Sequence, residues 1–114
     1  MKKTDKKTDK MLREALTRVC ETALEQVPGF QWLTHFVNYR AFPESLSVVC
    51  VFDSNSEFND AKSAQQDIYL MQLIEKELAS AGIRLPDIRR RVLFDTEENC
   101  RRENNGKWQH RFNH

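Results

Sequence analysis

The side chains best suited to chemistry in this sequence are basic, and they gather near the C-terminus, where they are interleaved with Trp108 and Phe112. A guanidinium group matches the oxygens of a phosphate, and an aromatic ring on an exposed strand can stack on an unpaired base. The candidate nucleic-acid-binding residues are Arg89, Arg90, Arg91, Arg101, Arg102, Lys107 and Arg111.

These arginines also have a purely structural interpretation. Three adjacent arginines on an edge strand would hinder pairing between the sheets of two molecules. They could also pair with Glu97, Glu98 or Glu103, at little gain in stability. The sequence alone does not decide between phosphate binding and this protective role.

The distribution of charge along the chain points to a charged partner. Residues 1–13 carry six Lys/Arg against two acids, residues 14–81 carry four against ten, and residues 82–114 carry eight against five. The formal net charge of +1 therefore hides two basic ends around an acidic middle. Phosphate or an acidic partner would be attracted to the basic ends.

A group of carboxylates forms a second candidate site. Asp53 follows one predicted strand, and Asp95, Glu97 and Glu98 stand at the end of another, so together they could bind a divalent ion as in a metal-dependent hydrolase. Carboxylates at strand ends and in the first turns of helices more often cap the helix or oppose its dipole. We therefore expect no metal ion and no cofactor, and hydrolysis stays a third alternative.

Signatures of other enzyme classes are missing from the sequence. Its three glycines, Gly29, Gly82 and Gly106, each stand at a predicted turn or cap, which excludes a Walker loop and a dinucleotide-binding fingerprint. Its three cysteines are odd in number and widely spaced, which argues against a disulfide framework. No residue is assigned a catalytic role, and we expect a protein that is not an enzyme.

The sequence offers nothing suited to a bilayer or to secretion. The longest apolar run, residues 48–52, is far shorter than the about 20 residues that cross a bilayer. The N-terminus begins with lysines but lacks the apolar stretch of a secretory signal. The expected location is the cytoplasm, without membrane contact.

Hydrophobic spacing predicts two main helices. Residues 1–8 repeat Lys-Lys-Thr-Asp almost without apolar side chains, and we expect them to form a mobile basic arm. Apolar residues at three- and four-residue intervals then predict a helix over 10–27, with Leu16 in the core. A second apolar stripe, over 61–78, predicts a helix that ends before Gly82.

The remaining segments predict strands and one short helix. Apolar and β-branched residues predict strands over 30–39 and 46–52, the second with Val49 in the core. Side chains that alternate between two faces predict a third strand over 88–95 and a short last strand from Trp108 to Phe112. Between them, the spacing of Asp95 and Glu98 fits a capping box and predicts a short helix over 96–104.

The expected fold is a single two-layer α+β domain over residues 9–114, in the order α-β-β-α-β-α-β. We expect a mainly antiparallel sheet of about four strands, with the two main helices on one face.

Several stretches of the chain resemble a family of small bacterial proteins. They are the helix 12–27, the segment 32–39, the strand 46–52 and the two runs 94–100 and 103–108. Some members of that family are labelled Fis-family transcriptional regulators, and the resemblance implies DNA binding and a regulatory role. Fis proteins read DNA through a C-terminal helix-turn-helix, whereas residues 88–114 here predict a strand, a short helix and a second strand.

Together these observations lead to one hypothesis and one alternative. The leading hypothesis is a cytoplasmic protein, not an enzyme, that binds nucleic acid electrostatically through its basic C-terminal surface and N-terminal arm. The alternative is a protein-interaction or homodimerisation module whose acidic second helix contacts a partner. The acids on the polar side of that helix are Asp60, Asp67, Glu75 and Glu77.

Overall fold

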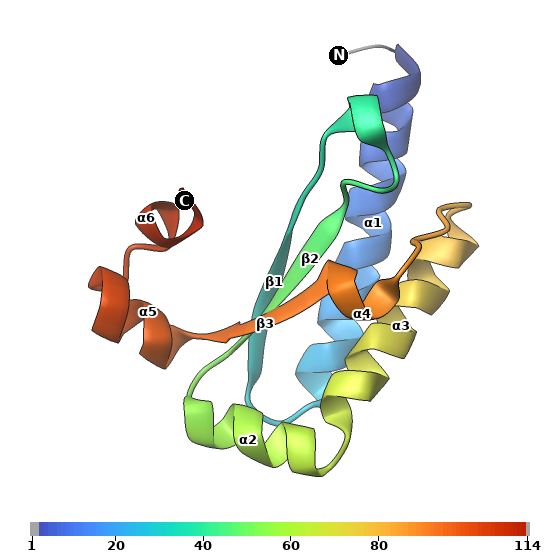
Figure 1. Cartoon of the computed structure of the whole chain (residues 1–114). Helices are drawn as coiled ribbons and strands as arrows, with labels where there is room; N and C mark the ends of the chain where they lie inside the picture. The colour runs from blue at the N-terminus through green and yellow to red at the C-terminus, as the bar shows by residue number, and fades with distance from the viewer. Residues whose placement is uncertain (1–2, 114) are drawn as a thin grey trace.

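The chain folds as an α+β protein with one three-stranded sheet (Figure 1). The computed structural model describes residues 3–113, and Met1, Lys2 and His114 lie outside the described residues. In chain order the elements are α1 (Lys3–Gln26), β1 (Phe30–Phe36), η1 (Tyr39–Ala41), β2 (Ser47–Phe52), α2 (Asn55–Ser63), α3 (Gln66–Ser80), α4 (Ile88–Arg91), β3 (Val92–Thr96), α5 (Glu97–Asn104) and α6 (Trp108–Phe112).

The sheet is mixed and has the order β1-β2-β3. β1 pairs with β2 in antiparallel fashion, placing His35 opposite Val48, whereas β3 pairs with β2 in parallel, placing Leu93 opposite Val49. The α+β class is confirmed, but the mainly antiparallel four-stranded sheet is wrong. The difference arises because residues 108–112 form a helix, so the structure has three strands where the sequence predicted four.

The main core lies between one face of the sheet and the helices α1 and α3, which pack against each other and cover that face (Figure 1). Leu16 of α1 and Ile74 of α3 are buried there against Val48 and Phe52 of β2. The predictions that Leu16 and Val49 are buried are confirmed, at 3% and 6% exposed. Because side chains alternate along a strand, Val49 points to the second face of the sheet, away from both helices.

The N-terminal helix is longer than its apolar stripe predicted. It begins at Lys3, so residues 3–8, which we expected in a mobile arm, form its first turns. Asp9 fixes this end, since it accepts hydrogen bonds from the Tyr39 hydroxyl at 2.7 Å and from Arg13 at 2.9 Å. Residues 1–2 of the expected arm lie outside the described residues.

The predicted second helix is two helices. Its apolar stripe continues from Ala61 in α2 to Leu70 in α3, but the chain turns at Gln65, whose φ of 60° is left-handed. The Ser54 side chain caps α2 by accepting from the Glu57 amide. No glycine marks this turn, so a continuous helix was the natural prediction from the sequence.

The C-terminal quarter differs most from the prediction. Residues 88–91 form the short helix α4, and β3 begins only at Val92. Residues 108–112, predicted as a strand, form the helix α6. The physical reason is that Trp108, Arg111 and Phe112 are spaced as i, i+3 and i+4, so a helix turns all three to the sheet while His110 stays exposed.

The helix predicted over 96–104 is confirmed as α5. Its cap is Thr96, whose hydroxyl accepts from the Asn99 amide at 3.0 Å, and Asp95 instead accepts from the Thr96 amide at 2.8 Å. None of the helices in residues 3–113 is both long enough and apolar enough to cross a membrane.

Truncating Leu16 to Ala tests this layer arrangement. We expect the free energy of unfolding to fall by about 2–5 kcal/mol, because the side chain is buried in the main core. Urea denaturation followed by circular dichroism measures the change. The matched control is Leu24→Ala on the same helix, whose side chain is 55% exposed and whose loss should cost no more than about 0.5 kcal/mol. Equal losses for the two variants would contradict the arrangement.

Candidate functional site

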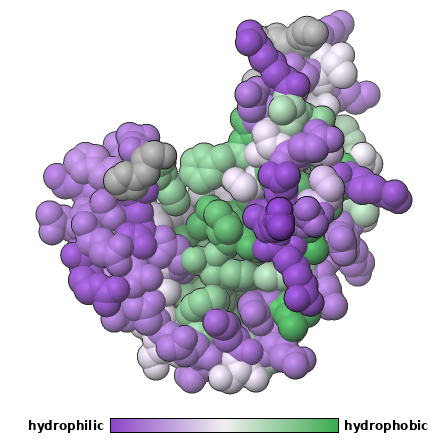
Figure 2. All heavy atoms as spheres, in the orientation of Figure 1, coloured by the Kyte–Doolittle hydropathy of each residue, from purple (hydrophilic) through white to green (hydrophobic). Residues whose placement is uncertain are grey.

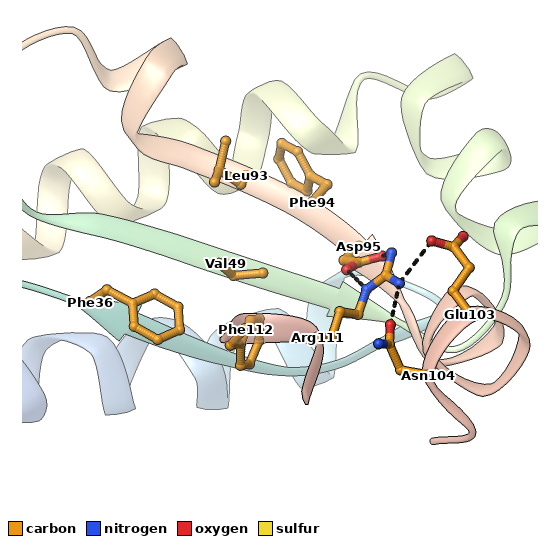
Figure 3. Close-up of a pocket in the computed structure, with 9 residues that line it drawn as sticks. All are labelled: Phe36, Val49, Leu93, Phe94, Asp95, Glu103, Asn104, Arg111 and Phe112. Atoms are coloured by element: carbon orange, nitrogen blue, oxygen red, sulfur yellow. Dashed lines mark hydrogen bonds and ion pairs between the residues drawn. The ribbon is translucent and has the colours of Figure 1, made fainter. Parts of the chain in front are cut away.

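The second face of the sheet carries a groove. Its floor is formed by Phe36 of β1, Val49 of β2 and Leu93 of β3, its far wall by Phe112 of α6, and one end by Arg111 with its partners (Figure 3). We call this the sheet-face groove. It has a volume of about 520 Å³ and is open to solvent on one side.

The floor of the sheet-face groove is unusually apolar for an uncovered surface. Leu93 is 50% exposed and Phe36 is 43% exposed, which makes them two of the large apolar side chains most accessible to solvent. Figure 2 shows a hydrophobic band over the sheet, hollowed between the hydrophilic atoms of α5 and α6 and those of α4. Contiguous exposed apolar surface with a polar rim is typical of a binding site.

Arg111 holds α6 over the sheet. Its Nε donates to Asp95 at 2.6 Å and its Nη2 donates to the second Asp95 oxygen at 3.1 Å, while its Nη1 donates to Glu103 at 3.0 Å and to Asn104 at 3.1 Å. The bonds to Asp95, and less strongly those to Glu103, raise the pKa of Arg111 above its ordinary value. The same guanidinium, aided by Arg102, lowers the pKa of Glu103. The pairing of Arg111 with Asp95, Glu103 and Asn104, which we call the clamp, therefore has a structural role and leaves few N–H donors for a ligand.

Aromatic pairs complete the wall. The rings of Phe36 and Phe112 lie 5.0 Å apart, and those of Trp32 and Trp108 lie 4.9 Å apart, both in edge-to-face geometry. Both indole nitrogens donate to the same oxygen of Glu97, at 3.1 and 2.8 Å. The wall is therefore fixed by aromatic packing and by one shared carboxylate.

The candidate metal site is not assembled. Asp95 binds Arg111, Glu97 binds the two indoles, and Glu98 accepts from the Asn55 amide at 3.0 Å, while Asp53 is exposed. Across residues 3–113 no group of three His, Cys, Asp or Glu side chains is arranged to hold a metal ion. Asp95, Glu97 and Glu98 are instead engaged in holding α2, α5 and α6 in place.

The predicted basic residues divide into two groups at opposite ends of β3. Arg89, Arg90 and Arg91 lie on α4, before the strand, and the others lie on α5, α6 and the turn between them, after it. β3 has five residues and is therefore about 16 Å long, and the two groups lie beyond its two ends. The sheet-face groove lies between them (Figure 2).

Most of these basic side chains have no partner within the molecule. Among the described residues, no ion pair or side-chain hydrogen bond engages Arg89, Arg90, Arg101 or Lys107, and all four are exposed. Arg91 is half-buried, and its Nε is enclosed without a hydrogen-bond partner. The expected pairing with glutamates occurs only after β3, where Arg102 and Arg111 bind Glu103.

Sequence reasoning missed the apolar residues of the groove. Leu93 and Asp95 stand two residues apart in the predicted third strand, so they share one of its faces, and they line the groove together. The signal available was the alternation in β1 and β3, which puts Phe36 and Leu93 on the face away from the core. What the alternation could not show is that nothing in residues 3–113 covers them completely.

The cysteines and His35 are poorly placed for catalysis. Burial raises the pKa of the Cys50 thiol to about 12 and also raises the pKa values of Cys20 and Cys100, so all three are protonated near neutral pH and are weak nucleophiles. His35 is half-buried, and burial lowers its pKa despite the nearby charge of Asp9.

No match to a known protein assigns a function to the groove. The chain matches no protein-family model, no curated protein and no solved structure. Its function is therefore inferred from the residues of the groove and its flanks.

Replacing Arg111 by Met tests the clamp. The side chains of Arg111 and Asp95 are only 18% and 17% exposed, so the variant leaves a largely buried carboxylate without its partner. We expect the free energy of unfolding to fall by about 1–3 kcal/mol, measured by urea denaturation with circular dichroism. Arg101→Met, which removes an exposed arginine from α5, is the control and should cost no more than about 0.5 kcal/mol. Indistinguishable variants would refute the role assigned to Arg111.

Lowering the pH tests the burial of His35. Its pKa in the folded protein lies below the value of about 6.5 in an unfolded chain, so the unfolded chain takes up the proton first. The contribution of neutral His35 to the free energy of unfolding is therefore fully present above about pH 6.5, and it is lost as the pH falls below that value. Melting temperatures measured between pH 7.5 and 5 should show this decline, and His35→Asn should reduce it. His110→Asn, at an exposed position, should leave the decline unchanged; a decline that survives His35→Asn in full would assign it to other groups.

Proposed function

We propose that this chain is a cytoplasmic nucleic-acid-binding protein that is not an enzyme. The observation that carries the proposal is the set of unpaired cations on both sides of the sheet-face groove: Arg89 and Arg90 on α4, and Arg101 and Lys107 on the opposite flank. Guanidinium groups that have no partner within the protein remain free to bind phosphate.

The positive and negative charges also lie on different parts of the surface. From Ile88 to Phe112 the chain has seven basic residues against four acidic ones, and two of the acids, Asp95 and Glu103, are already bound to Arg111. α2 and α3, from Asn55 to Ser80, have five acidic residues against two basic ones. A polyanion is therefore attracted to the flanks of the groove and repelled by the surface of α2 and α3.

Arg111 is assigned a different role from the other basic residues. Its guanidinium donates four hydrogen bonds to Asp95, Glu103 and Asn104, so binding phosphate would require breaking the clamp. Arg111 is accordingly a positioning residue for α6. The phosphate contacts are left to the four unpaired side chains, Arg89, Arg90, Arg101 and Lys107. Arg91 adjoins Arg90 on α4, and the exposed Arg102 joins them by leaving its surface pair with Glu103.

The resemblance to proteins labelled as Fis-family regulators makes DNA the first target to test, and a regulatory role follows if binding is found. A second short helix does follow the turn at Gly106, contrary to the sequence prediction. It has five residues, and Trp108, Arg111 and Phe112 contact the sheet or α5. A recognition helix needs an exposed face that enters the major groove, so binding by phosphate contacts is the mode that fits α6.

The N-terminal lysines contribute to the same proposal more weakly. Lys6, Lys7 and Lys10 are exposed on the first turns of α1, and Lys10 lies 3.9 Å from Glu14. α1 covers the face of the sheet opposite the groove, so these lysines attract a polyanion at long range and are not expected to contact one lying in the groove.

Self-association is the second candidate function, and exposed Phe36 and Leu93 favour it. Two apolar sheet faces could pack against each other in a homodimer. The acidic surface predicted to meet a partner is partly used within the molecule, because Glu77 pairs with Arg18 of α1 at 2.7 Å. Light scattering across protein concentration distinguishes a monomer from a dimer.

Removing both exposed arginines of α4 tests nucleic-acid binding. If the wild-type protein engages about four phosphates of a DNA duplex, log K against log salt concentration should have a slope of about −3 to −4. Arg89→Ala/Arg90→Ala should flatten the slope to about −2 and weaken binding similarly for unrelated sequences. Fluorescence anisotropy with labelled duplex DNA, single-stranded DNA and RNA measures both quantities.

The control removes the same charge from another surface. Lys62→Ala/Lys76→Ala deletes two exposed lysines from α2 and α3 and should leave the slope unchanged. Equal effects of the two double variants would show that only net charge matters. If the wild-type protein binds none of the three nucleic acids below about 100 μM, the proposal fails, since non-specific DNA binding is commonly tighter than this.

A further inference from the structure

We infer that the sheet-face groove binds single-stranded nucleic acid, with unpaired bases on its apolar floor and phosphates on its two basic flanks. This inference rests on the proposed function and names the form of nucleic acid that the site takes. Three features of the structure lead to it: the composition of the floor, the placement of the flanks and the rigidity of the wall.

The floor suits the faces of unpaired bases. Phe36 and Leu93 are 43% and 50% exposed, and Val49 lies between them on the central strand (Figure 3). Bases stack or pack on such side chains without regard to sequence, because every base has an apolar face. In a duplex the faces of the bases are covered by their neighbours and cannot reach this floor.

The two basic flanks lie on either side of the groove, where the sugar-phosphate backbone of a strand crossing it would pass. The cations of α4 and those of α5 and Lys107 lie beyond opposite ends of β3, a strand about 16 Å long. A strand crossing the groove would meet basic side chains on both sides while its bases face Leu93 and Phe36. The charge of this rim is complementary to a phosphate backbone and unsuited to a second copy of the same basic rim.

A duplex fits the surface less well. Proteins read a duplex with an element that protrudes into a groove of the DNA, most often a helix. Here the centre of the surface is hollow, and the flanking helix α4 has only four residues. A duplex would therefore touch only the arginines on the rim and gain nothing from the apolar floor.

The far wall is held in place before any ligand arrives. Arg111 fixes α6 by its paired bonds to Asp95, and Phe112 of the same helix packs on Phe36. A bidentate guanidinium–carboxylate pair sets direction as well as distance. The width of the groove is thus set by the protein, which reduces the entropy lost on binding.

The experiment compares one oligonucleotide in two forms, a labelled 15-nucleotide oligothymidylate and a labelled 15-base-pair DNA duplex, by fluorescence anisotropy at low salt. The variant Phe36→Ser/Leu93→Ser removes the apolar floor and keeps every arginine. We expect at least about fivefold weaker binding of the oligothymidylate and less than a twofold change for the duplex. Leu93→Ser alone changes a half-exposed side chain, so it tests the same point if the double variant is unstable.

The matched control is Met11→Ser/Leu24→Ser, which removes two exposed apolar side chains from α1, on the opposite face of the sheet. It should leave binding of both nucleic acids unchanged. Arg89→Ala/Arg90→Ala should weaken both, because both forms contact the rim. Circular dichroism and melting temperature confirm that each variant is folded.

The remaining outcomes separate this inference from the proposed function. If both forms bind, respond to the arginine variant and ignore the floor variant, the base contacts are refuted while nucleic-acid binding stands. If neither form binds, both proposals fail. If light scattering shows a dimer that Phe36→Ser/Leu93→Ser converts to a monomer without weakening oligothymidylate binding, the floor is a self-association surface and the inference is overturned.

Discussion

The parallel pairing of β3 with β2 decides how the rest of this molecule is arranged. Two antiparallel strands can be joined by a tight turn, but parallel strands need a crossover, and here α2, α3 and α4 supply it. The crossover brings α3 beside α1 on one face of the sheet, where both bury their apolar stripes. The second face is left to the chain after β3. That segment has only two short helices, of eight and five residues, and they cannot cover three strands.

The uncovered face stays open because a polar contact seats the C-terminal helices at one end of it. Asp95, the residue before the last of β3, lies on the groove side, and Arg111 reaches it from α6. An apolar contact alone would allow α6 to slide toward Leu93 and bury it, whereas paired hydrogen bonds tie α6 to one position. The clamp thus engages Arg111, whose side chain is 18% exposed, while Arg89 and Arg90 of α4 form no ion pair within residues 3–113. A residue that looked like a ligand for phosphate instead determines the shape of the surface to which phosphate is proposed to bind.

The sequence predicted those elements whose apolar pattern is local. The C-terminal end of α1, the β-branched run of β2 and the start of α5 all lie within one residue of their predicted positions. The break at Gln65 was not predictable, because the apolar stripe runs through it and the left-handed turn is made by a residue that is not glycine. Alternation from Trp108 to Phe112 was ambiguous, since five residues fit either a strand or one turn of helix. The candidate site was predicted in part: the basic residues were recognised, but the pairing of Arg111 and the exposure of Phe36 depend on contacts between distant segments.

The two tryptophans of this chain contact each other where α6 meets the sheet, and that arrangement has a consequence for fluorescence. One indole comes from β1, the other from α6, and a single carboxylate oxygen of Glu97 accepts from both. The tryptophan emission of the protein therefore originates where the C-terminal helices meet the sheet. Movement of α6 away from the sheet separates the two rings and exposes both indoles to water at once. Tryptophan fluorescence therefore reports directly on whether the wall of the groove is in place.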